Sequence, residues 1–214
     1  TGVQTCALPI YGPVNMDRPE VKAFIAKAKK AAGTEWAGAE RFLCEEPRGA
    51  SASDPLVEPT KIFDNVYLLG KDGGEIYAIT GSEGIILLGS GAANETESVL
   101  IPGLQKLGLD PTKIKAVVIA HGHADHFGGA KYLQEKYGAH VYISSQDWDL
   151  MEHPPAPAGG EKKKAAAPVL PNHDMLLTEG QPVVVGDAKV TPVFIPGHTP
   201  GSMALIFPVK DNGK

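Results

Sequence analysis

Short apolar segments separated by glycine-containing turns dominate the middle of the chain. Residues 66–69, 75–80 and 84–88 form three such segments, a pattern that predicts a β-meander. Apolar residues then follow at helical spacing over 95–107, and residues 116–120 form a wholly apolar strand of the kind that is buried on both faces. Because strand, helix and strand alternate here, we expect an α/β fold.

The alternation continues toward the C-terminal end. The pattern predicts a helix over residues 127–137 that ends at Gly138, a strand over 141–143 and a short helix over 145–151. Several further β-segments lie within residues 183–207. We therefore expect a second group of strands after the helices.

One segment matches neither a helix nor a strand. Residues 153–172 contain Pro-Pro, Gly-Gly, a lysine run and an alanine run, and they are too long for an ordinary connection. Loops of this length are usually lids, binding loops or disordered insertions. We expect this one to cover a substrate, with Trp148 just before it.

The N-terminal part differs from the rest of the chain. Asp17 to Glu20 match a capping box, and apolar residues at helical spacing continue up to Gly33. Residues 48–59 are rich in Ser, Ala, Asp and Pro, as in a linker. The prediction is an N-terminal helical extension over residues 11–60 and a main domain over 61–214.

The two ends carry their own signals. Residues 1–10 lack the charged and apolar regions of a signal peptide and resemble a translated sequencing adapter. At the other end, the chain stops at Lys214 in a polar turn directly after a strand-like segment. We expect a metagenomic fragment whose first ten residues are an artefact and whose domain is incomplete at the C-terminus.

Composition narrows the classes of function. Of 214 residues, 43% are hydrophobic and 21% charged, which is ordinary for a globular protein. The net charge of −5 provides no electrostatic footprint for nucleic acid, and the apolar runs are too short to cross a bilayer. A small-molecule substrate is the expected partner, and the sequence does not indicate the oligomeric state.

Candidate chemistry follows directly after the apolar strand. His121-Gly-His123-Ala-Asp125-His126 places three of the chain's seven histidines within six positions. In an extended segment His121 and His123 would point the same way and share one metal, which leaves Asp125 and His126 for a second ion. A helix N-cap is the alternative role for Asp125. Imidazole and carboxylate ligands favour zinc, with iron or manganese still open.

A second histidine motif lies near the end of the chain. His198 is bracketed by Pro196-Gly197 and Thr199-Pro200-Gly201, in a turn directly after a β-segment. An isolated histidine of this kind most often packs or forms hydrogen bonds. Together with the first cluster, it is expected to be a further metal ligand.

The two motifs together resemble those of the metallo-β-lactamase superfamily, and the resemblance runs from about residue 61 to the end. It implies an αββα sandwich with a two-metal site. By this resemblance His121, His123 and His198 would hold the first Zn²⁺, and Asp125 and His126 the second. Among subclasses, the motifs are most similar to the third, histidine-rich subclass of metallo-β-lactamases, whose exported members imply a periplasmic or secreted protein.

Two departures from the family pattern affect the site. Gly89 stands where relatives usually have an aspartate that braces the metal loop, and losing such a partner typically costs about 10- to 100-fold in metal affinity or activity. Ser90 or a water could replace it. The remaining ligand of the second metal would lie beyond Lys214.

The resemblance implies a zinc-dependent hydrolase of the lactamase-like type. A metal-bound hydroxide would attack an amide, lactam or ester carbonyl, and Asp125 would orient the hydroxide and handle the proton as the catalytic residue. Three alternatives stay open. They are a lactone or thioester hydrolase, an iron-dependent sulfur dioxygenase of the same fold, and a degenerate, non-catalytic metal-binding domain.

Overall fold

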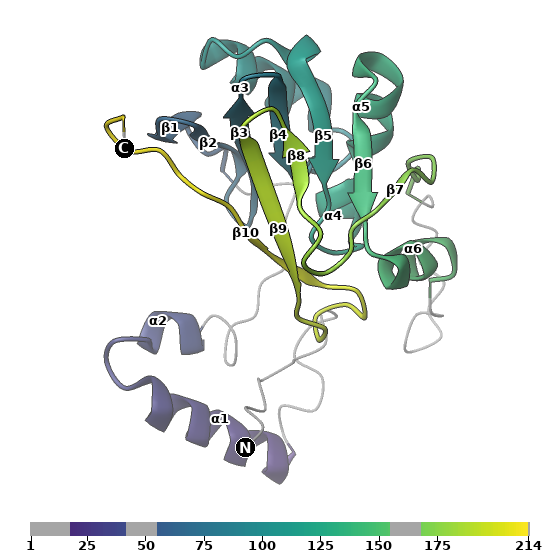
Figure 1. The fold of residues 1–214 in the computed structure, drawn as a ribbon. Coiled ribbons are helices and arrows are strands. Elements are labelled where there is room, and N and C mark those ends of the chain that lie inside the picture. Colours follow the sequence, from purple (N-terminus) through teal and green to yellow (C-terminus); the bar gives the residue numbers. More distant parts are fainter. Residues whose placement is uncertain (1–17, 42–54, 155–167, 214) are drawn as a thin grey trace. The chain divides into compact units, whose positions relative to one another are not determined.

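A computed structural model describes residues 18–41, 55–154 and 168–213 of the chain (Figure 1). Its contacts divide the chain into one unit that ends at Ser51 and another that begins at Ala52. Within the described ranges, no helix has the length and apolar character needed to span a bilayer.

The first unit is helical, as the sequence predicts. Helix α1 spans Pro19–Ala32 and ends at Gly33, whose φ of 57° is readily adopted by glycine. The short helix α2, Ala37–Glu40, follows. The predicted capping box is wrong in its N-cap, because Arg18 holds that position without a side-chain cap. Pro19 at the first helical position fixes a helical φ there instead.

The second unit contains a large mixed sheet. Its order is β1-β2-β3-β4-β5-β6-β7, antiparallel from β1 to β4 and parallel from β4 to β7. Its seven strands are Thr60–Phe63, Val66–Lys71, Gly74–Gly81, Gly84–Leu88, Ile114–Val118, His140–Ile143 and Met175–Leu176. Strands β2 to β4 confirm the predicted meander.

Side chains of the central strands pack on both faces of this sheet. In β4, Ile85 and Leu87 belong to one buried cluster, whereas Ile86 and Leu88 belong to another on the opposite face. Strand β5 divides in the same way, with Val117 on the first face. Because both faces are buried, these strands need apolar residues at consecutive positions, which explains their unbroken apolar pattern.

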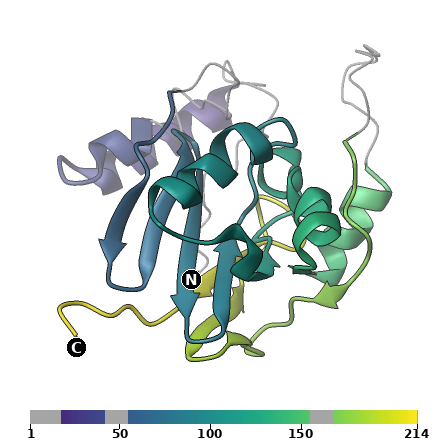
Figure 2. The ribbon, with the colours of Figure 1, turned by 90° about the horizontal axis from the view of Figure 1, so that it is seen from above.

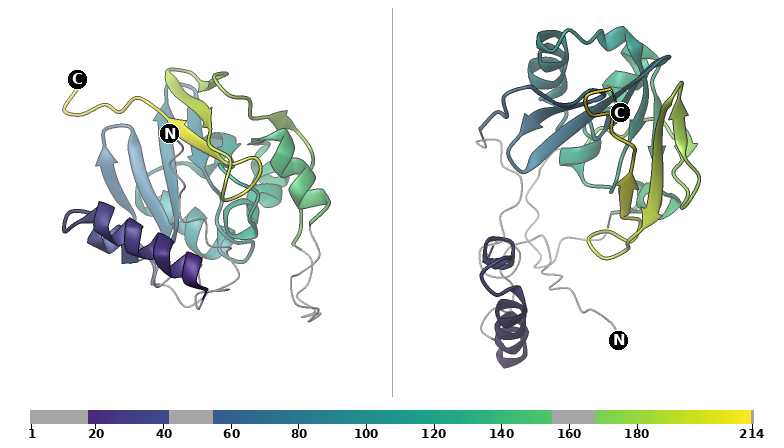
Figure 3. Two further views of the ribbon diagram at one scale, coloured as in Figure 1. Left: turned by 90° about the horizontal axis from the view of Figure 1, so that it is seen from below. Right: turned by 60° about the vertical axis from the view of Figure 1, so that its left-hand side comes forward.

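Helices cover the first face of the large sheet, and a smaller sheet covers the second (Figures 1 and 2). The helical elements of this unit are a π-helical turn Thr96–Leu100, α3 Ile101–Lys106, a 3-10 turn Pro111–Lys113, α4 Ala124–Phe127, α5 Ala130–Tyr137 and α6 Ser145–Glu152. The small antiparallel sheet has the order β10-β9-β8, with β8 Val183–Val185, β9 Ala188–Phe194 and β10 Met203–Ile206. Figure 3 shows the two sheets from further directions.

Two predicted helices are interrupted in the structure. The helix expected over residues 95–107 consists of the π-helical turn followed by α3. The helix expected over 127–137 is broken at Gly128 and Gly129 into α4 and α5. A Cβ at Gly128 would lie 2.5 Å from the Ala93 nitrogen, so the break lets two backbones approach closely.

The predicted lid falls mostly outside the described residues, which omit 155–167. The expectation that Trp148 helps to cover a substrate is not supported by its position. Its side chain is 2% exposed and belongs to the core on the helical face of the large sheet. The reason is its place on the inner face of α6, where an indole ring buries a large apolar area.

Candidate metal centre

The first histidine segment leaves the large sheet in a tight turn. Strand β5 ends at Val118, and the backbone N–H of His123 donates to the carbonyl of His121 at 3.0 Å. The expectation of an extended segment with alternating side chains is therefore wrong. The turn still brings the two imidazole rings together, with centroids 4.9 Å apart.

The second histidine segment, which contains His198, lies at the tip of the β9–β10 hairpin. The N–H of Ile195 donates to the carbonyl of Ser202 at 2.9 Å and closes the loop that contains His198. The next residue, Met203, donates its N–H to the carbonyl of Ala120 at 2.9 Å. This bond joins the hairpin to the backbone just before His121, so the two histidine segments meet where the two sheets come together.

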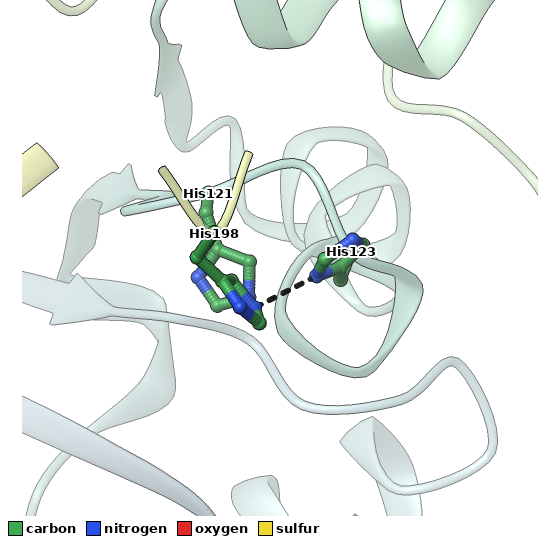
Figure 4. A group of neighbouring side chains, drawn as sticks. All are labelled: His121, His123 and His198. Atoms are coloured by element: carbon green, nitrogen blue, oxygen red, sulfur yellow. Dashed lines mark hydrogen bonds between the residues drawn. The ribbon is translucent and has the colours of Figure 1, made fainter. Parts of the chain in front are cut away.

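Three imidazole nitrogens converge at this junction. His198 Nε2 lies 3.0 Å from His123 Nδ1, a residue 75 positions away, and 3.2 Å from His121 Nε2. Figure 4 shows the three rings with their nitrogens turned toward one another. A tetrahedral shell with metal–nitrogen bonds of roughly 2.0–2.1 Å places neighbouring nitrogens about 3.3 Å apart. The two distances from His198 are close to this value, and all three donor atoms lie within 4.8 Å of one another. The trio could therefore hold a small divalent ion such as zinc.

Electrostatics keep the enclosed rings neutral. The pKa of His121 is lowered to about 2, first by burial and then by the neighbouring rings of His126, His198 and His123. Burial is also the main cause that lowers the pKa of His123 and of His126. Neutral imidazoles keep a lone pair available for a metal ion at physiological pH.

Asp125 and His126 lie beside this trio but are not part of it. The ring of His126 has its centroid 4.1 Å from that of His121, and its Nε2 lies 3.9 Å from Asp125 Oδ2. The alternative role of Asp125 as an N-cap is not supported, because His123 is the N-cap of α4 and α4 has no side-chain cap. Within the described residues, the Asp125 carboxylate accepts no hydrogen bond. Their role as ligands of a second ion stays a prediction.

Ser90 holds the first histidine segment in place, next to Gly89, where the chain departs from the family pattern. Both its backbone N–H and its hydroxyl donate to the carbonyl of His126 at 2.8 Å, and its side chain is fully buried. Gly89 has a φ of 81°, in the left-handed region that favours glycine. The His121–His126 segment is therefore held by the Ser90 hydroxyl and backbone N–H, and position 89 provides no carboxylate.

One residue of this region is not predicted from the sequence. Asp147 is fully buried, and its carboxylate contacts both histidine segments. In the sequence it forms a Ser144-x-x-Asp147 pattern, which indicates a helix start. Ser144 does cap α6 by accepting from the N–H of Asp147. The Asp147 side chain, however, points away from the cap toward the histidine loops.

The remaining histidines of the described chain pair with carboxylates elsewhere. His140, His153 and His173 have exposed side chains and contact Asp174, Asp149 and Glu152, respectively. His173 also stacks on Trp148, with ring centroids 4.2 Å apart.

Comparisons with known proteins agree on one family. A family model described as the metallo-beta-lactamase superfamily matches residues 69–211. A hydroxyacylglutathione hydrolase of Crocosphaera subtropica is 30% identical over 140 residues, which are 61% of this chain and 46% of that protein. This chain thus spans about half the length of that relative.

Solved structures with the same fold are described as subclass B3 metallo-beta-lactamases. BJP-1 of Bradyrhizobium japonicum has a TM-score of 0.65 and 31% identity, over 74% of this chain and 59% of that one. MEM-A1, from a soil metagenome library, has a TM-score of 0.65 and 27% identity, over 75% and 61%. The expected resemblance and the expected fold class are confirmed.

Proposed function

The chain belongs to the metallo-beta-lactamase superfamily, and on that premise we propose that it is a zinc-dependent hydrolase of small molecules that contain an amide, lactam or ester carbonyl. The observation that carries the proposal is the convergence of His121, His123 and His198, in which His198 Nε2 lies 3.0 Å from His123 Nδ1 and 3.2 Å from His121 Nε2. These two distances and the lowered pKa values of His121 and His123 suit zinc.

Each residue of the site has a distinct role in this proposal. His121, His123 and His198 hold the first ion, and Asp125 with His126 contributes to a second. When bound, zinc supplies a water whose pKa falls to about 7 and polarises the carbonyl oxygen. The Asp125 side chain is 40% exposed and forms no hydrogen bond within the described chain, so it is available to accept a proton from water and to pass it to the leaving group.

The lactamase-like activity is the first candidate. It is supported by the 31% identity to BJP-1 and by the motif around His198, in which Ser202 is buried and accepts a hydrogen bond from the N–H of Thr199 at 2.9 Å. A thioester hydrolase is the second candidate, because a hydroxyacylglutathione hydrolase is 30% identical over 140 residues.

A two-substrate assay tests the proposal. The chain is freed of metal with a chelator, reloaded with Zn²⁺ or Fe²⁺, and offered a chromogenic cephalosporin and a hydroxyacyl thioester of glutathione. We expect hydrolysis that disappears with the chelator and returns with Zn²⁺, with a preference for the lactam. A preference for the thioester would favour the second candidate, and activity with Fe²⁺ alone would contradict the zinc assignment.

Two histidine variants provide the matched comparison. His121→Ala removes a proposed ligand, whereas His140→Ala removes an exposed histidine that pairs with Asp174. Only the first is expected to abolish hydrolysis. If metal-loaded preparations hydrolyse neither substrate, the proposed hydrolase function is wrong, and the alternative of a non-catalytic metal-binding domain is favoured.

A further inference from the structure

A buried carboxylate connects the two histidine segments. Asp147 lies in the first turn of α6, and its side chain is fully buried. Its Oδ2 accepts from the N–H of Gly122 and from the hydroxyl of Thr199, both at 2.7 Å. Its Oδ1 accepts from the N–H of Gly201 at 2.8 Å. Gly122 lies between two of the converging histidines, and Thr199 directly follows the third.

The two loops are shaped to approach this carboxylate. A Cβ at Gly201 would lie 2.8 Å from Asp147 Cγ and would overlap the Ser144 hydroxyl. A Cβ at Gly122 would lie 3.2 Å from Asp147 Cβ. Such close backbone approaches are a common reason for glycine at a fixed position. Both histidine segments therefore pack their backbones directly on the start of α6.

The charge of Asp147 has no cationic side chain beside it. All three of its partners donate to the carboxylate, which suits an ionised aspartate because that group only accepts. Within the described chain, no lysine, arginine or histidine forms an ion pair with it. The charge does act on the neighbouring site, since it opposes the lowering of the His123 pKa. A buried carboxylate is costly without a compensating charge.

We propose that Asp147 is a positioning residue of the metal centre, which fixes the His198 loop against the His121–His123 turn and offsets the charge of the cation held between them. The proposal rests on the proposed function, because it assigns Asp147 a role toward the same metal. Partners of this kind orient ligands, and losing them typically costs about 10- to 100-fold in metal affinity.

Zinc affinity of the full chain tests this role. In a competition titration of Zn²⁺ against a chromophoric chelator, we expect Asp147→Asn to weaken binding by about 10- to 100-fold. The amide offers one acceptor oxygen instead of two and carries no charge. The matched control is Asp149→Asn on the same helix, whose carboxylate is 80% exposed, and its affinity is expected to equal that of the unsubstituted chain.

A second pair of variants covers the case in which Asp147→Asn does not fold. Thr199→Val keeps the shape of the side chain but removes the hydroxyl that donates to Asp147, whereas Thr199→Ser keeps the hydroxyl. We expect a weaker affinity for Thr199→Val, by about tenfold, and recovery in Thr199→Ser. The visible absorption of bound Co²⁺ should change with Thr199→Val and return with Thr199→Ser, because it reports the ligand geometry.

The outcomes separate this inference from the function on which it rests. If the unsubstituted chain binds no Zn²⁺, the proposed function fails, and the inference fails with it. If that chain binds Zn²⁺ while Asp147→Asn and Thr199→Val bind it equally tightly with the same Co²⁺ spectrum, only the inference is overturned. A lower melting temperature of the metal-free variants with unchanged affinity would likewise show a purely structural role.

Discussion

The two histidine segments reach the same point by different means. The segment from His121 to His126 follows a strand buried on both faces, and the carbonyl of His126 accepts two hydrogen bonds from the buried Ser90. His198 lies at the tip of a hairpin and is exposed. Its loop is held by Asp147, whose carboxylate accepts bonds from Thr199 and Gly201. Asp147 also accepts from the N–H of Gly122, so both segments depend on partners from elsewhere in the chain. The difference is that the first segment is half-buried and continues a core strand, whereas His198 is exposed on a hairpin tip.

Removing one proposed ligand from either segment should have the largest effect, on the affinity for Zn²⁺. Structural zinc sites bind with about 10–16 kcal/mol, or about 3 kcal/mol per ligand, so His121→Ala and His198→Ala should each weaken Zn²⁺ binding by at least about 100-fold. The metal-free chains should differ. Only His121→Ala removes a largely enclosed ring, and it should lower the free energy of unfolding by about 1–2 kcal/mol.

Isothermal titration with Zn²⁺ and urea unfolding of the metal-free proteins measure the two effects separately. If the two variants destabilised the metal-free chain equally, the contrast between an enclosed and an exposed ligand would be wrong.

A larger residue where the hairpin packs on α6 should have the next largest effect, on the free energy of unfolding. A Cβ at Gly201 meets Ser144 and Asp147, so Gly201→Ala should lower the free energy of unfolding by about 1–3 kcal/mol. Gly197, in the same loop, has no atom within 4 Å of such a Cβ. Gly197→Ala should therefore change the stability by less than about 1 kcal/mol. Similar urea midpoints for the two variants would contradict the packing of this loop on α6.

A smaller effect on stability is expected at Ser90, which holds the first histidine segment. Ser90→Ala removes a buried hydroxyl that donates to the His126 carbonyl at 2.8 Å, and the cost should be about 1 kcal/mol. The carbonyl keeps its second bond, from the Ser90 N–H. In Ser98→Ala, the lost hydroxyl also donates to a carbonyl at 2.8 Å but is exposed. In thermal unfolding, Ser90→Ala should have a lower melting temperature than Ser98→Ala. Equal melting temperatures would show that the Ser90 hydroxyl does not stabilise the first histidine segment.

The convergence of the histidines could be predicted from the sequence, because His121, His123 and His198 lie in two local motifs. Their role as metal ligands stays a prediction. The buried strands are visible in the sequence as unbroken apolar runs. Asp147 is not predicted, because a carboxylate three residues after a serine indicates a helix start. Its contacts arise only when segments separated by 25 and 52 positions meet.

The elements that the sequence does not predict have two causes. Strands β1 and β7 expose their residues, so they lack the apolar pattern that marks a strand. The break between α4 and α5 depends on the approach of the Ala93 backbone to Gly128, which no spacing of apolar residues encodes.

The smallest effect on stability is expected at the far end of the small sheet, away from the hairpin tip that carries His198. Asp187 accepts from Lys210 Nζ at 2.5 Å and from the N–H of Ser82 at 2.7 Å, which joins the β8–β9 turn to the large sheet. The Lys210 bond is the main cause that lowers the pKa of Asp187 to about 2, below the usual 3.8. A carboxyl group with a lowered pKa stabilises the fold above its unfolded pKa, and this stabilisation is lost as the pH falls through the folded value.

Asp187→Asn should therefore melt slightly below the unsubstituted chain at pH 6, and the difference should shrink toward pH 2 and vanish below it. Asp211→Asn, a neighbouring exposed aspartate without an ion pair among the described residues, is the control. A difference that stayed undiminished from pH 6 to pH 2 would show that Asp187 acts through its shape rather than its charge.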